Sequence, residues 1–144
     1  NGTPASETVL SAAIAGHFGA PILMATGDAD YVAHVRDVLG GIETVVTKTA
    51  YGRVAAQTAT PTQSRAWISE AVPKALARAG EQSPFILEPP VILEADFQRH
   101  MAPELLSYLP SVERVASKTI RFKGRDITDI SKFLAVVAHY SYAL

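Results

Sequence analysis

The chain has 144 residues, enough for one compact domain with a single core and short for two. Its 48% hydrophobic and 19% charged residues are typical of a globular domain, and a net charge of −1 gives no sign of nucleic-acid or anionic-membrane binding. The absence of cysteine excludes disulfides and thiolate metal sites and permits a reducing cytoplasm, the location we expect.

The sequence has no apolar run that could form a membrane span, and its N-terminus has no signal-peptide pattern. No apolar run approaches the roughly 20 residues that a membrane helix needs, so we expect a soluble protein. The chain begins at Asn1 without an initiator methionine, as a processed product, an expression product or a fragment would. An α/β domain normally opens with a strand, whereas this chain opens at the cap of a helix, which favours the fragment.

The first third of the chain alternates helices with short apolar strands. Apolar residues at helical spacing predict a helix over about 4–18, which Gly19 ends. Residues 21–25 form a short apolar run, typical of a buried parallel strand. Asp28 or Asp30 is expected to cap a second helix, because a carboxylate there accepts hydrogen bonds from the first free amides.

The pattern then changes to a β-branched segment followed by a long helix. Residues 42–47 predict a second strand, which runs into 48–53 as a loop or a sheet edge. Thr60 as a cap and Pro61 at the first helical position predict the start of a long amphipathic helix.

The second half of the chain predicts further strands between two helices. Residues 91–97 alternate as a strand, a short helix follows over 102–108, and 112–122 suggests one or two strands. Asp126 is expected to cap the last helix. This order favours an α/β fold with layered helices on a partly parallel sheet, in one domain over 1–144.

Glu7 is the most informative polar residue in the chain. Helical spacing places it on one side with an apolar stripe of Leu10, Ser11, Ile14 and Phe18. The first 35 residues contain no lysine or arginine, and a buried unpaired carboxylate costs several kcal/mol or becomes protonated. Backbone donors, a distant cation or a metal would have to stabilise it. The alternative is a half-exposed glutamate in the first turn, favoured by the helix dipole.

The other candidate ligands have simpler interpretations. The histidines show no HxH, HxxxH or HExxH spacing, so we interpret them as structural or surface residues: His17, His34, His100 and His139. Asp28 and Asp30 resemble a carboxylate pair, but a helix cap explains them.

Two groups of basic side chains are candidate binding residues. Lys48 and Arg53 follow a predicted strand and either hold a substrate carboxylate or lie in a solvated loop. Arg121, Lys123 and Arg125 alternate toward a strand end. We interpret them as a solvated edge strand rather than a phosphate site.

A family resemblance runs through the whole chain in order. The stretch ETVLSAAIAGHFGAPILMATGDAD, residues 7–30, resembles the zinc-dependent D-aminopeptidase (DppA) family, in which a metal-binding glutamate opens a helix that leads to an apolar strand and a Gly-Asp turn. The likeness covers only the C-terminal half of that family. Further similar segments are 46–53 with Ala55, Ala56 and Pro61, then the strand 90–97, the Leu109-Pro110 turn and the closing helix from Asp126.

The resemblance implies a two-zinc aminopeptidase that acts on short peptides or amides with a D-residue at the amino end. In that family an Asp-x-Glu pair and two histidines lie upstream of the helix glutamate, whose position here is Glu7. The catalytic histidine also lies upstream, so we expect no catalytic residue in this half and no activity from it alone. Lys48 and Arg53 match a lysine and an arginine of the family and become substrate-side candidates.

The resemblance also implies an assembly. The family forms ring-shaped homo-oligomers, and Ala135, Val136 and Tyr140 would give an apolar helix face for such an interface. The missing N-terminal half would be a further partner. The alternative from another class is a non-catalytic α/β binding or assembly domain that keeps the fold and lacks the metal chemistry.

Overall fold

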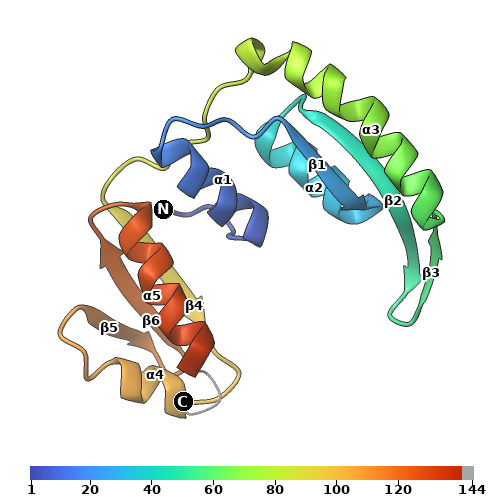
Figure 1. The fold of residues 1–144 in the computed structure, drawn as a ribbon. Helices are drawn as coiled ribbons and strands as arrows, with labels where there is room; N and C mark the ends of the chain where they lie inside the picture. The colour runs from blue at the N-terminus through green and yellow to red at the C-terminus, as the bar shows by residue number, and fades with distance from the viewer. Residues whose placement is uncertain (141–144) are drawn as a thin grey trace. The chain divides into compact units, whose positions relative to one another are not determined.

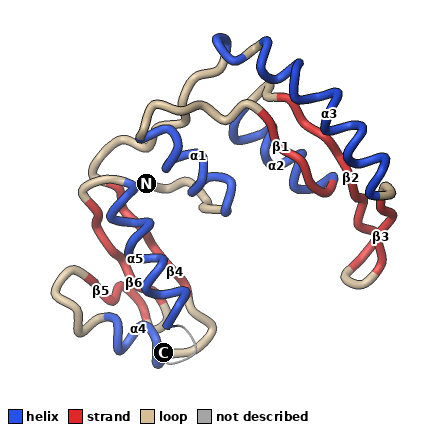
Figure 2. The backbone as a smooth tube through the Cα atoms, viewed as in Figure 1, coloured by secondary structure: helices blue, strands red, loops and turns tan. Residues whose placement is uncertain are grey.

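A computed structural model describes residues 1–140, and the side chain of Tyr140 lies outside that description. The chain divides into two compact units: the first unit, Glu7–Phe85, and the second unit, Asn1–Ser6 with Ile86–Leu144. Figures 1 and 2 show the helices and strands of each unit. That residues 1–144 form a single domain stays a prediction. Within the described part, no helix is long and apolar enough to cross a membrane.

The first unit is a three-stranded sheet with helices on both faces. β1 and β2 run parallel, β2 and β3 form an antiparallel hairpin, and the strand order is β1-β2-β3. Figure 1 shows α2 and α3 on opposite faces of β1 and β2. The elements are α1 (Glu7–His17), β1 (Met24–Asp28), α2 (Ala29–Leu39), β2 (Glu43–Gly52), β3 (Ala55–Thr58), α3 (Pro61–Ala77) and the 3-10 helix η1 (Ala79–Glu81).

Local capping and a small core hold this βαβ unit together. Oδ1 of Asp28 accepts a hydrogen bond of 2.8 Å from the amide of Tyr31 and so caps α2, as predicted. Thr60 caps α3, as predicted, and the structure adds a capping box in which Gln63 is its partner. The buried core between α2 and the sheet consists of Ala25, Val35 and Ile42.

The buried face of α1 differs from the predicted one. Phe18, at the end of the expected apolar stripe, is 73% exposed. A Cβ at Gly16 would overlap the backbone of Phe85, so small residues let the helix approach that segment closely. The buried face of α1 is therefore the one with small residues, and the large apolar side chains are not fully buried. The buried residues of α1 are Val9, Ala12, Ala13 and Gly16.

The second unit is an antiparallel sheet of order β4-β6-β5 packed against two helices. Leu106, Val112 and Ile120 form its buried core. The Phe122 and Phe133 rings stack with centroids 4.3 Å apart. Its elements are β4 (Val91–Asp96), α4 (Met101–Leu106), β5 (Val112–Ala116), β6 (Thr119–Gly124) and α5 (Ile127–Tyr140).

Helix caps and strand pairing together determine where the helices and strands begin and end. The structure confirms a mixed α/β fold with helices on a partly parallel sheet. Oδ1 of Asp126 accepts from the amides of Thr128 and Asp129 at 2.8 and 3.3 Å, so the predicted cap of α5 is confirmed. β1 starts three residues later than the predicted strand 21–25 and ends three residues later, because its ladder with β2 runs from Met24 to Asp28.

Of two expectations about edges, one was wrong. The segment expected as a loop or an edge belongs to β2, which continues to Gly52; beyond Lys48 it pairs with β3 alone, so the edge alternative holds there. The strand expected to be a solvated edge is β6, which lies at the centre of its sheet. Its Arg121 faces Glu94 on one neighbouring strand and Glu113 on the other.

Candidate functional site

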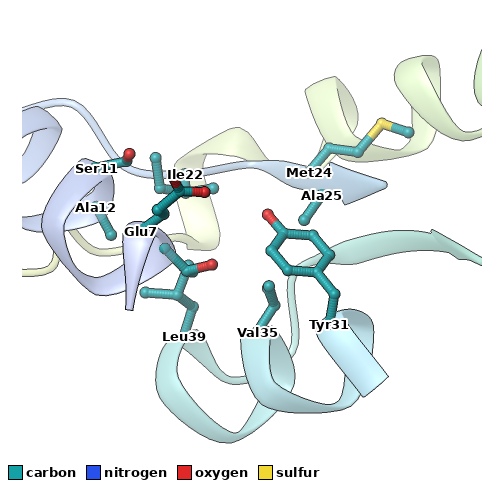
Figure 3. A pocket seen from close by; sticks show the side chains of 10 residues that line it. Glu7, Ser11, Ala12, Ile22, Met24, Ala25, Tyr31, Val35 and Leu39 are labelled. Atoms are coloured by element: carbon teal, nitrogen blue, oxygen red, sulfur yellow. The ribbon is translucent and has the colours of Figure 1, made fainter. Parts of the chain in front are cut away.

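A cleft of about 350 Å³ opens between α1 and α2, beside β1. Figure 3 shows its lining, in which apolar side chains such as Ile22, Val35 and Leu39 surround a few polar groups. The polar side chains in the lining include Glu7 and Tyr31. A volume of this order and a mostly apolar lining with few polar groups are typical of sites that bind small molecules.

Glu7 lies at the first position of α1 and its side chain is exposed to the cleft. Within residues 1–140, no hydrogen bond or ion pair holds its carboxylate. This exposed position in the first turn agrees with the expected alternative of a first-turn glutamate, which the positive end of the helix dipole favours. A charged oxygen donor that faces a cleft and carries no partner is suited to a cation; its role as a metal ligand stays a prediction.

Tyr31 is a cleft residue that the sequence interpretation missed. Figure 3 shows its ring among the cleft residues. The ring lies against Gly27, where an added Cβ would come within 2.5 Å of Cδ1. No other described residue binds its hydroxyl. The sequence signal for this contact is Gly27, directly before the cap of α2, because a residue without a side chain leaves room for the Tyr31 ring.

Asp28 and Lys48 meet at the carboxyl end of β1. Oδ2 of Asp28 lies 3.6 Å from Nζ of Lys48. The hydrogen bond from the Tyr31 amide lowers the pKa of the Asp28 carboxyl, burial opposes this, and the Lys48 ammonium lowers it further. Asp28 therefore stays ionised as the cap of α2. Lys48 lies within β2, half exposed, with this carboxylate beside it.

Arg53 lies in the exposed turn between β2 and β3. At about 3.3 Å per residue, the strand places it roughly 16 Å from Lys48. Among the described contacts, none joins Arg53 to Lys48 or to Glu7. The structure thus leaves the two substrate-side candidates apart from each other, and their role stays a prediction.

The histidines occupy separate places. His17 packs edge-on against Phe18 with ring centroids 5.0 Å apart. Nδ1 of His100 lies 3.3 Å from the Ser117 carbonyl, and Nδ1 of His139 lies 2.7 Å from that of Ala135. In the described part of the chain, no three histidines or carboxylates gather closely enough to hold a metal ion. Glu7 has the donor chemistry for zinc, yet the described residues form no complete zinc site.

Comparison with known proteins gives the family. The chain is 22% identical to a D-aminopeptidase of Bacillus subtilis (strain 168) over 138 residues, which are 95% of this chain and 50% of that protein. It matches the solved structure of the Zn-dependent D-aminopeptidase DppA from Bacillus subtilis, a self-compartmentalizing protease, with a TM-score of 0.90 and 21% identity over 96% of this chain and 51% of that one. The chain therefore spans about half the length of these relatives. Because the sequence profile of the D-aminopeptidase family matches residues 1–136, the chain belongs to that family.

Proposed function

We propose that this chain is the C-terminal half of a zinc-dependent aminopeptidase that releases N-terminal D-amino acids from short peptides or amides. The observation that supports the proposal most directly is the unpartnered carboxylate of Glu7 at the start of α1, facing a cleft. The sequence resemblance implies that its position corresponds to a metal-binding glutamate of the family. Membership of the D-aminopeptidase family supports the reaction class.

In this proposal Glu7 is one ligand of a site with two zinc ions per complete protomer. The first turn of α1 presents the carboxylate to the cleft, and within residues 1–140 no lysine or arginine pairs with it. A single carboxylate does not satisfy zinc, which takes three or four ligands from the protein. The other ligands and the catalytic histidine would come from the N-terminal half. Zinc in such sites acts as a Lewis acid and lowers the pKa of bound water, which supplies the hydrolytic nucleophile.

Lys48 and Arg53 are proposed to act on the substrate side. Arg53 is exposed in the hairpin turn and offers a planar fork of donors for a carboxylate. Lys48 is already partnered by Asp28, so it would contribute a positive potential more than a direct contact. Since the two lie roughly 16 Å apart along the strand, we expect one substrate group to engage only one of them.

The proposal includes assembly of several copies. The structurally similar relative is a self-compartmentalizing protease. Val136, from the apolar face expected on α5, is 49% exposed, and Ala135 is exposed beside it, as a subunit interface requires. The cytoplasmic location stays a prediction.

Zinc content and hydrolysis, measured on the protein made from its natural gene, test the role of Glu7. Glu7→Gln keeps the shape of the side chain and removes its charge. We expect a fall from two zinc ions per protomer to about one by mass spectrometry, with hydrolysis of D-alanyl peptides slower by at least about a hundredfold.

Glu70→Gln is the matched control, because Glu70 is an exposed carboxylate on α3 of the same unit. It should leave zinc content and hydrolysis unchanged. Residues 1–144 alone should bind no stoichiometric zinc and hydrolyse nothing. Full zinc content and an unchanged rate in Glu7→Gln would exclude this residue from the site.

A further inference from the structure

Tyr31 is held in place from two sides at the carboxyl end of β1. Its backbone amide donates a hydrogen bond of 2.8 Å to Oδ1 of Asp28. Its ring lies against Gly27, where an added Cβ would come within 2.5 Å of Cδ1. Only two rotatable bonds orient a tyrosine ring, so contacts at the backbone and at the ring leave it little freedom. The ring is therefore a fixed part of this unit.

This ring forms one wall of the cleft that contains Glu7. Both residues line the same volume of about 350 Å³, and Figure 3 shows the Tyr31 hydroxyl pointing into it. Within residues 1–140, no other residue binds that hydroxyl. Tyr31 is only 38% exposed, although it lies in the first turn of a helix with an open side. A group that fills the cleft beside Glu7 therefore contacts the Tyr31 ring.

The lining favours one chemical class for that group. Among the described residues that line the cleft, Glu7 is the one with a full charge at neutral pH, and none is a lysine or an arginine. A negatively charged group would find no partner there and would be repelled by the carboxylate. Apolar walls come from Ile22, Val35 and Leu39, and burial of apolar surface against them is favourable. An uncharged, apolar group fits this lining best.

The volume of the cleft limits the size of the group. Sites for whole small molecules span about 300–1,000 Å³, and this cleft is at the lower end of that range. A cleft of this size holds one side chain and not several residues of a peptide. Tyr31 and Val35 are neighbours one turn apart on α2, so removal of the ring would open the cleft above Val35.

We propose that this cleft is the subsite for the side chain of the substrate's N-terminal residue, that it takes uncharged apolar side chains, and that Tyr31 limits their size. The inference rests on the proposed function, because that function places the N-terminal residue of the substrate beside Glu7. Tyr31 is in this scheme a specificity-determining residue and takes no part in binding zinc. The preferred substrates are then peptides or amides that begin with an aliphatic D-residue.

Specificity ratios of the complete gene product test this role of Tyr31. The ratio kcat/KM is measured for D-alanyl, D-leucyl, D-phenylalanyl and D-aspartyl amides. We expect the original protein to favour the D-leucyl over the D-aspartyl amide by at least about tenfold. In Tyr31→Ala the preference for D-phenylalanyl over D-leucyl should rise by about 10–100-fold, because the space of one ring admits another. Tyr31→Phe keeps the ring and should keep the original ratio.

A ratio of substrates separates a role in specificity from a structural role. A variant that is only less stable loses the same share of its activity with every substrate, so its ratios stay unchanged. Tyr108→Ala is the matched control, because Tyr108 is a tyrosine of the second unit, 71% exposed and outside the cleft. It should change no ratio. Zinc content should equal that of the original protein in all three variants.

The outcomes distinguish this inference from the proposed function. An unchanged preference in Tyr31→Ala, or a D-aspartyl amide hydrolysed as fast as the D-leucyl amide, would overturn the subsite and leave the proposed function standing. Hydrolysis of none of the four amides by the original protein would reject the proposed function and the subsite with it. If Tyr31→Ala does not fold, Tyr31→Leu removes the ring while keeping apolar surface, and the preference for D-phenylalanyl should rise in the same direction.

Discussion

The two units treat their charged groups differently. In the second unit, Nη2 of Arg121 lies 2.6 Å from Glu94, and its Nη1 lies 3.4 Å from Glu113, so a ladder of ion pairs crosses the sheet. In the first unit, Glu7 and Arg53 carry no partner within the described residues. Surface ion pairs add little stability, but they leave no group available for a ligand. Within residues 1–140, the cleft carboxylate of Glu7 is therefore available for a ligand, whereas Lys48 in the same unit is engaged by Asp28.

The cores of the two units show the same contrast. Leu106, Val112 and Ile120 of the second unit are buried together, and partly buried aromatic rings pack around them. In the first unit the core of Ala25, Val35 and Ile42 borders a cleft of about 350 Å³, and Leu39 lies at the boundary. A closed core serves as a scaffold, whereas a core that borders a cleft leaves apolar surface for a ligand or a further element.

Truncation of one large side chain in each unit gives the largest expected effect. Ile120→Ala, at a residue with 0% exposure, should cost about 2–5 kcal/mol in the free energy of unfolding, because it leaves a cavity in a closed core. Leu39→Ala at the cleft should cost about 1 kcal/mol, because less area returns to water and no closed cavity forms. Urea unfolding of the 144-residue chain measures both. Equal losses would show that the cleft side is packed as tightly as the second unit.

The acidic pair at the start of α2 gives an effect of intermediate size. Asp28→Ala removes the side chain that accepts the Tyr31 amide, and the cap is worth about 1 kcal/mol. Asp30→Ala, two residues later and exposed, keeps that hydrogen bond and should cost less than about 0.5 kcal/mol. The two urea midpoints give the comparison. If Asp30→Ala cost as much as Asp28→Ala, the cap would not be the stabilising contact.

Helix starts and strand-helix alternation could be predicted because their signals are local. Asp28, Thr60 and Asp126 each cap a helix through side-chain oxygens and amides two or three residues away. Pairing between strands is a long-range property, and there the prediction was less successful. The central place of β6 and the length of β2 depend on partner strands that no short pattern contains.

The candidate site was predictable only where a family pattern existed. Glu7 was singled out by an apolar stripe that proved to be the wrong face of α1, and separately by the family resemblance; its role as a metal ligand stays a prediction. Tyr31 was not singled out as a site residue from the sequence. Its place in the cleft depends on the room that Gly27 leaves, and that contact is between a strand and the following helix. Residues from two elements define a cleft, so spacing along one element does not predict it.

The smallest effect concerns the pH dependence of the second unit. The Asp129 carboxylate accepts from Nε and Nη2 of Arg125 at 2.7 and 2.8 Å, and these hydrogen bonds hold the pKa of Asp129 well below its usual value. Since the folded pKa is below that of the unfolded chain, about 3.9, the pair stabilises the fold above that pH. The stabilisation is lost progressively as the pH falls through the folded pKa.

Asp129→Asn should therefore flatten the acid side of the stability profile. Between about pH 6 and about pH 3 its urea midpoint should fall less than that of the original chain, because the ionised pair is no longer available to be lost. Arg125→Met should flatten the profile in the same way by removing the guanidinium. An unchanged slope in both variants would mean that the pair also forms in the unfolded chain. The stability of the second unit would then come from the buried core around Ile120 and not from its ion pairs.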